Sequence, residues 1–108
     1  MKPSKKIKSL HSLIDIVTKL KKENKRIVFT NGCFDIIHPG HMKVFEEAKK
    51  KGDILIVGVN SDKSIKTIKG PKRPILNQKA RTYIVSSFES VDYVTLFNEA
   101  TPLRLIKE

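Results

Sequence analysis

Three short segments rich in apolar residues constrain the fold of this chain more than any other feature. They are Arg26-Ile-Val-Phe-Thr30, Asp53-Ile-Leu-Ile-Val-Gly-Val59 and Asp92-Tyr-Val-Thr-Leu-Phe97. The first two are almost wholly apolar, which is typical of strands that are covered on both faces within a parallel sheet. Because segments with helical patterns separate the three strands, the sequence predicts an α/β fold with right-handed crossovers.

The predicted helices lie before, between and after these strands. Apolar residues at helical spacing predict an amphipathic helix within 9–25. Pro39 suits the first turn of a second helix that runs to about Lys51, and Asn77 caps a third that runs to about Phe88. Thr101 and Pro102 begin a last one. The stretch 60–69 is polar, with at most one helical turn after Asp62, and 70–74 is a loop.

With 108 residues, the chain has room for one domain. We expect a basic, flexible start over 1–8, a helix within 9–25 and the α/β core over 26–108. No apolar run is long enough to cross a bilayer. The single cysteine, Cys33, excludes an intrachain disulfide, which is typical of a cytoplasmic protein. The net charge of +11 attracts polyanions such as nucleotides, phosphates or nucleic acid.

The loop after the first strand carries the densest set of functional residues. In a parallel α/β sheet, ligands bind beyond the carboxyl ends of the strands. Gly32 lets the backbone approach a phosphate, and the helix that begins at Pro39 offers free N–H groups and the positive end of its dipole. His38 and His41 are three residues apart, so they point to the same side, near this anion site.

Two imidazoles beside a polyphosphate can donate hydrogen bonds and stabilise the charge that develops on a leaving pyrophosphate. A pair of this spacing is also compatible with metal ligation or with a solvated surface. The strand, the glycine and the helix start around His38 and His41 favour the phosphate interpretation.

The segment Thr30-Asn-Gly-Cys-Phe-Asp-Ile-Ile-His-Pro-Gly-His41 resembles the signature of the cytidylyltransferase-like nucleotidyltransferases, whose HxGH motif binds the triphosphate. Within that family, the chain is most similar to the heptose 1-phosphate adenylyltransferases, whether free-standing or the second domain of a bifunctional kinase-adenylyltransferase. The resemblance runs from about Ile7 to the end and includes 52–62, 69–74, 91–94 and 101–103. It implies a Rossmann-like fold and transfer of an adenylyl group from ATP, with Mg²⁺, to a sugar 1-phosphate.

The resemblance also implies roles for single residues. His38 and His41 would be the catalytic pair. The residues that would bind the nucleotide are Gly32, Cys33, Phe34, Lys66, Lys69 and Arg81, with the two lysines reaching phosphate from a mobile loop. The residues that would meet the second substrate or order its site are Asp35, Asn60 and Asp62.

The family pattern continues with a further strand and a Ser-Thr-Thr-like helix start that contacts the nucleotide, and this sequence lacks both. In the family's sheet the first strand is central, so Ile27-Val-Phe29 would here lie at an exposed edge. We expect a homodimer partner or a further segment of chain to cover this edge.

Two other functions are compatible with the same residues. One keeps the chemistry and changes the substrates, to CTP with glycerol 3-phosphate or a similar acceptor. The other is an inactive module that binds phosphate or nucleic acid, which the charge of +11 favours. The aromatic content argues against binding of nucleic acid: the chain has two Tyr, five Phe and no Trp, and its sequence shows no platform on which bases could stack.

Overall fold

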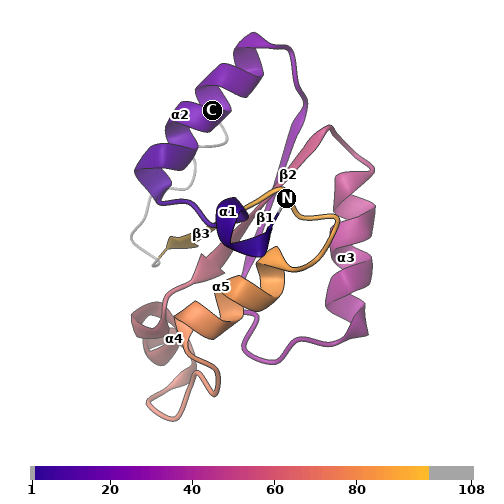
Figure 1. Ribbon diagram of the computed structural model, residues 1–108. Helices are drawn as coiled ribbons and strands as arrows, with labels where there is room; N and C mark the ends of the chain where they lie inside the picture. The colour runs from indigo at the N-terminus through magenta and orange to yellow at the C-terminus, as the bar shows by residue number, and fades with distance from the viewer. Residues whose placement is uncertain (1, 98–108) are drawn as a thin grey trace.

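The computed structural model describes residues 2–97 and shows an α/β domain (Figure 1). The three strands and the helices predicted before and between them follow the predicted order, and two further short helices are present among the described residues. The helices and strands are α1 Pro3–Lys6, α2 Leu10–Lys22, β1 Ile27–Gly32, α3 Pro39–Lys49, β2 Ile54–Asn60, α4 Asp62–Lys69, α5 Gln78–Ser86 and β3 Tyr93–Phe97. The helix predicted to begin at Thr101 lies outside the described residues.

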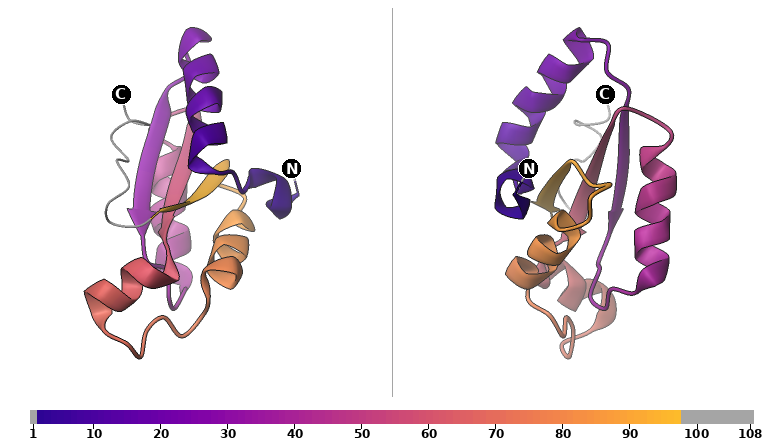
Figure 2. Two further views of the ribbon diagram at one scale, coloured as in Figure 1. Left: turned by 90° about the vertical axis from the view of Figure 1, so that its left-hand side faces the viewer. Right: turned by 45° about the vertical axis from the view of Figure 1, so that its right-hand side comes forward.

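The three strands form a parallel sheet in the order β1-β2-β3, which confirms the predicted fold class. Helices α3 and α5 cover one face of this sheet and α2 covers the other (Figure 2). Strand β2 alternates between the two layers: Leu55 and Val57 pack toward α3 and α5, whereas Ile56 packs toward α2. Because both faces of β2 are buried, its sequence is a continuous apolar run.

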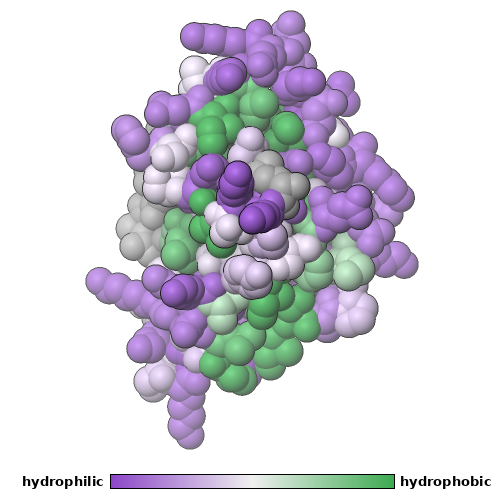
Figure 3. Space-filling view, in the orientation of Figure 1, coloured by the Kyte–Doolittle hydropathy of each residue, from purple (hydrophilic) through white to green (hydrophobic). Residues whose placement is uncertain are grey.

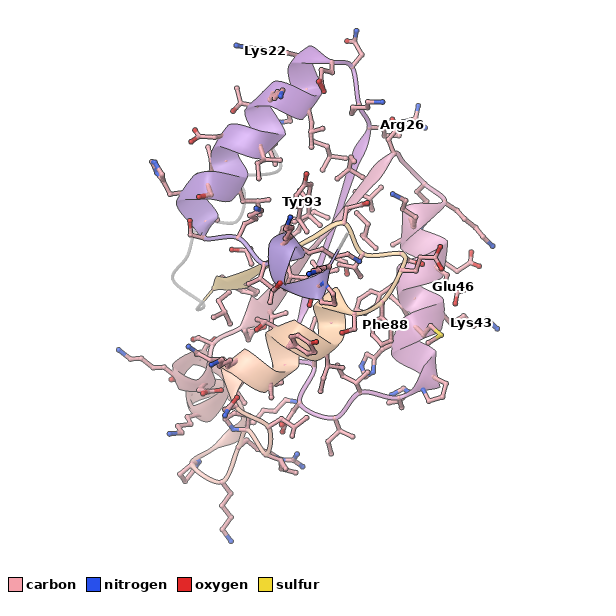
Figure 4. All side chains as sticks on the ribbon, in the orientation of Figure 1. Lys22, Arg26, Lys43, Glu46, Phe88 and Tyr93 are labelled. Carbon is pink, nitrogen blue, oxygen red and sulfur yellow. The ribbon has the colours of Figure 1, made fainter. Side chains whose placement is uncertain are left out.

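The core between the sheet and its helices is closed by aromatic rings. Phe45 of α3 is 1% exposed, and its ring lies 5.3 Å from that of Phe88, just after α5. Figure 4 shows Phe88 between α5 and α3, whereas Lys43 and Glu46 project from the outer side of α3. Phe45 and Ala48 therefore pack inward, as their helical spacing predicts, whereas Val44 is 54% exposed.

The basic start of the chain is folded onto the domain, which corrects the prediction that 1–8 is flexible. Residues 3–6 form α1, and the Lys6 ammonium is buried and donates to the Phe88 carbonyl at 3.0 Å. Ile7 bridges to Val94 of β3, and the Lys8 N–H donates to the Val94 carbonyl at 2.8 Å. The prediction failed because it was based on charge, whereas this long lysine stem packs against the fold and only its tip needs a partner.

A second correction concerns residues 60–69, for which we expected at most one helical turn. The structure has a full helix, α4, whose start is capped by the Ser61 hydroxyl accepting from the Ser64 N–H at 3.1 Å. Lys66 and Lys69 therefore lie on a helix and not in a loop. Ile65 anchors this helix to the domain because its side chain is fully buried.

Strand β1 lies at one end of the sheet formed by the described residues. Its side chains are half-buried apart from the exposed Asn31, whereas β2 is buried from Leu55 to Asn60. Covering of this edge by a second copy or a further segment stays a prediction. No helix among residues 2–97 is both long enough and apolar enough to span a membrane.

Candidate functional site

A cavity of about 510 Å³ opens at the carboxyl end of β1. Its walls come from the end of that strand, the loop 33–36, the first turns of α3, Lys69 at the end of α4, and Arg73 in the loop that follows α4. In Figure 3, hydrophobic residues gather in the region of α5 and the loop between β1 and α3. Ile36, which lines the cavity, is 58% exposed. The cavity therefore combines cationic groups with apolar surface, and it lies where a parallel sheet binds ligands.

The loop that follows β1 folds back on itself. Phe34 has a φ of 52°, in the left-handed region that residues other than glycine seldom adopt. Its ring covers Gly32 so closely that a Cβ atom there would lie 2.9 Å from the ring. The Phe34 ring also meets the His41 ring edge-on, with 5.6 Å between ring centroids. Phe34 therefore packs against both the end of β1 and His41.

The two histidines cap the start of α3 reciprocally. Nδ1 of His38 accepts a hydrogen bond from the Gly40 N–H at 3.0 Å, and Nδ1 of His41 accepts from the His38 N–H at 3.1 Å. Their ring centroids are 4.2 Å apart. A Cβ atom on residue 40 would lie 2.7 Å from the His38 ring, so this packing requires Gly40.

These caps determine which nitrogen of each imidazole carries the proton. Because Nδ1 is an acceptor in both rings, a neutral imidazole must carry its proton on Nε2. His38 and His41 therefore each keep an Nε2–H for a ligand, and His41 lines the cavity. The prediction that the helix start offers free N–H groups is corrected for Gly40 and His41, whose N–H groups already donate to His38.

His41 is held in its neutral form. Burial of the ring, and after it the positive charge of a protonated His38, lowers the pKa of His41 from its ordinary value of 6.5. At neutral pH His41 is therefore a hydrogen-bond donor through Nε2 without being an imidazolium.

This lowered pKa predicts how stability depends on pH. The unfolded chain, in which His41 titrates near 6.5, binds more protons below that pH than the folded chain does. The contribution of the neutral His41 ring to the free energy of unfolding is complete above pH 6.5. It is lost as the pH falls below 6.5 and through the lowered pKa. We expect urea unfolding between pH 7.5 and 5.5 to show a smaller loss of stability in His41→Asn than in the wild type. Equal losses in the two proteins would contradict this assignment.

Asp35, predicted to meet the second substrate or to order its site, holds the loop 73–76. Its carboxylate is 5% exposed. One oxygen accepts from the N–H groups of Ile75 at 2.7 Å and Leu76 at 3.1 Å, and the other accepts from Arg73 at 2.8 Å. Burial by itself raises the pKa of Asp35, but these hydrogen bonds and the charge of Arg73 outweigh burial, so the pKa lies below 3.8. Asp35 is therefore a carboxylate at neutral pH.

Arg81, which was predicted to bind the nucleotide, is bonded to other groups of the protein in this structure. Its side chain is fully buried and does not line the cavity. Its guanidinium donates to four groups, which are the carbonyls of Leu76, Cys33 and Asn60 and the carboxylate of Asp62. Arg81 therefore ties together the ends of β1 and β2, the start of α4 and the loop before α5. A direct contact with a nucleotide would require the groups that bury this side chain to move.

Some of the other predicted residues line the cavity, and the rest do not. Gly32, Cys33, Phe34 and Lys69 line the cavity. Lys66 is exposed on α4 and does not line it. Asn60 and Asp62 lie behind the cavity wall: the Asn60 amide donates to the Ser64 hydroxyl at 3.0 Å, and Asp62 pairs with Arg81 at 2.7 Å.

The sequence-based reasoning missed Arg73, which lines the cavity. Its position in a loop rich in Gly and Pro gave no periodic signal, although its charge beside Lys69 could have indicated it. Within residues 2–97, the His, Cys, Asp and Glu side chains form no group of three that could hold a metal ion.

Comparison with known proteins identifies relatives of this chain. The model of the cytidylyltransferase-like family matches residues 29–108. The bifunctional protein HldE of Aliarcobacter butzleri is 54% identical over 101 residues, which cover 94% of this chain and 21% of that protein. The protein of the same name from Nitratiruptor is 58% identical over 95 residues, 87% of this chain and 21% of the relative. The chain thus spans about a fifth of the length of these relatives.

A solved structure shares the fold. The crystal structure of the lipopolysaccharide core biosynthesis protein from Thermoplasma volcanium matches with a TM-score of 0.67 and 30% sequence identity. The match covers 77% of this chain and 66% of that one.

Proposed function

We propose that this chain, which belongs to the cytidylyltransferase-like family, carries a nucleotidyltransferase site that joins a nucleoside triphosphate to a phosphorylated acceptor. The observation that carries the proposal is the histidine pair, whose Nδ1 atoms accept from backbone N–H groups and whose Nε2–H groups are left for a ligand. Of the two, His41 lines the cavity, and His38 lies three residues before it at the start of α3. Donors held in place in this way stabilise charge without having to reorganise during the reaction.

In the proposed reaction, an oxygen of the acceptor's phosphate attacks the α-phosphorus of the triphosphate. The bond from that phosphorus to the bridging oxygen breaks, and pyrophosphate leaves with the electron pair. The Nε2–H groups of His38 and His41 donate to the phosphate oxygens on which negative charge increases. The acceptor supplies its own nucleophile, so no covalent enzyme intermediate is needed, and Cys33 has no nucleophilic role.

For the substrates, we propose ATP, which arrives with its Mg²⁺ ion, and a sugar 1-phosphate of the heptose type. Support comes from relatives named bifunctional protein HldE at 54% and 58% identity and from the lipopolysaccharide core biosynthesis protein that shares the fold. We also propose that the reaction takes place in the cytoplasm. The matched relatives are about five times longer than this chain, so the proposal concerns the site and not their whole activity.

The name of the matching family favours a second choice of substrates, CTP with glycerol 3-phosphate or a similar acceptor. The chemistry at the histidine pair would be unchanged. Only the base and the acceptor would differ.

A product assay tests the proposal. The purified chain is incubated with Mg²⁺, with ATP or CTP, and with heptose 1-phosphate or glycerol 3-phosphate in all four combinations. Pyrophosphate release and the nucleotide product are then measured. We expect release with ATP and the heptose phosphate, and little with the other combinations. Release with CTP and glycerol 3-phosphate would transfer the assignment to the second choice, and no release in any combination would contradict both.

A further inference from the structure

Arg73 reaches the cavity from a segment that is distant in sequence from the histidines. It lies between α4 and α5, and together with Lys69 it lines the same cavity as His41. Its side chain is 39% exposed, so solvent, and hence a soluble ligand, can reach the guanidinium. Two cations and an imidazole N–H donor thus border one cavity.

Asp35 fixes the position of Arg73. The guanidinium donates through one terminal nitrogen to the Asp35 carboxylate at 2.8 Å. The same carboxylate also accepts from the N–H groups of Ile75 and Leu76, so the backbone just after Arg73 is held as well. Since a guanidinium has five N–H donors, this contact leaves others for a ligand.

Arg81 provides the contrast. Its side chain is fully buried and donates to four protein groups, whereas Arg73 makes one side-chain hydrogen bond within the part of the chain that the structure describes. An arginine that is held at one end and open to a cavity can bind phosphate oxygens in the bidentate manner.

We infer that Arg73 binds a phosphate group of a substrate in this cavity and that Asp35 is the positioning residue that holds Arg73 there. The inference rests on the proposed function, since it takes the cavity to be the phosphate site. The phosphate belongs either to the nucleotide or to the phosphorylated acceptor, which share this chemistry.

Binding of tripolyphosphate, measured by calorimetry on the full chain, tests the role of Arg73. We expect Arg73→Gln to weaken binding about tenfold or more, because it removes charge-assisted hydrogen bonds, and Arg73→Lys to recover part of the loss. Lys72→Gln removes the same charge from the same loop, but Lys72 does not line the cavity, so we expect less than about a twofold loss. Equal losses in Arg73→Gln and Lys72→Gln, or no binding by the wild type, would overturn the inference.

Asp35 is tested through a double variant. If Asp35 acts through Arg73, Asp35→Asn weakens tripolyphosphate binding in the wild type but adds nothing in the Arg73→Gln background. A purely structural role predicts that the two effects add. Thermal unfolding of each variant identifies any that has lost its fold, and Arg73→Lys keeps the test available if Arg73→Gln unfolds.

Kinetics distinguish the two sources of the phosphate and separate this inference from the proposed function. A rise in KM for ATP alone in Arg73→Gln assigns the phosphate to the nucleotide, and a rise in KM for the acceptor alone assigns it to the acceptor. If the wild type releases no pyrophosphate but its binding of tripolyphosphate still depends on Arg73, the proposed function is wrong. The inference that Arg73 binds a phosphate group in this cavity would then still stand. If Arg73→Gln keeps full activity and unchanged binding of tripolyphosphate, the inference on Arg73 is wrong and the proposed function is kept.

Discussion

Replacing His41 with asparagine is expected to lower the rate of pyrophosphate release by about a hundredfold to a thousandfold, as loss of one preorganised donor does in other enzymes. The amide oxygen of asparagine occupies the place of Nδ1, so it can still accept from the His38 N–H and keep the cap of α3. The Nε2–H donor that faces the cavity is lost. The substitution therefore separates the ligand contact of His41 from its structural role.

His11 provides the control for this experiment. It is exposed on α2, on the opposite face of the sheet from α3, so His11→Asn makes the same chemical change away from the cavity. We expect its rate to equal that of the wild type. Equal rates for His41→Asn and His11→Asn would show that the His41 donor takes no part in the reaction.

The second large effect concerns stability. Replacing Arg81 with methionine is expected to lower the free energy of unfolding by about 3 kcal/mol, at the lower end of the range for breaking a buried ion pair. Methionine fills a similar volume but leaves Asp62 unpaired and three backbone carbonyls without this donor. The lower end applies because the Asp62 side chain is 32% exposed, so water reaches it.

Urea unfolding of Arg81→Met and of Arg26→Met measures this effect. Arg26 is exposed just before β1, and Figure 4 shows it at the end of the sheet remote from the cavity. We expect the change in Arg26→Met to stay within about 0.5 kcal/mol, as is usual for surface substitutions. If Arg81→Met proved as stable as Arg26→Met, the guanidinium would not be what holds the cavity walls together.

Local features of the sequence predicted the elements that carry the site. The apolar runs predicted the three parallel strands, and Asn77 and Pro39 marked the starts of α5 and α3. These signals suffice because a helix cap involves neighbouring residues, and because a strand that is covered on both faces is itself a continuous apolar run in the sequence. The same local argument located the cavity at the end of β1, since topology puts the ligand site of such a sheet there.

The roles of single charged side chains could not be predicted in this way. Arg81 and Arg73 are both arginines near the same cavity, yet one is fully buried behind its wall and the other lines it. The sequence left open whether Asp35 meets the second substrate or orders its site, and the structure shows that it holds a loop about 40 residues further along the chain. A charge far from its partner in sequence has no periodicity, so only the folded arrangement shows what it contacts.

For this protein, the sequence alone determined a parallel α/β sheet and a loop in which two histidines meet a helix start, because turn chemistry, capping and apolar patterning are local. The tertiary structure decided which nitrogen of each imidazole is left for a ligand, which arginine lines the cavity and that the basic start folds onto β3. Except for the imidazole caps, these outcomes depend on contacts between segments far apart in the chain. Burial then determines whether a charged group supports the fold or meets a ligand.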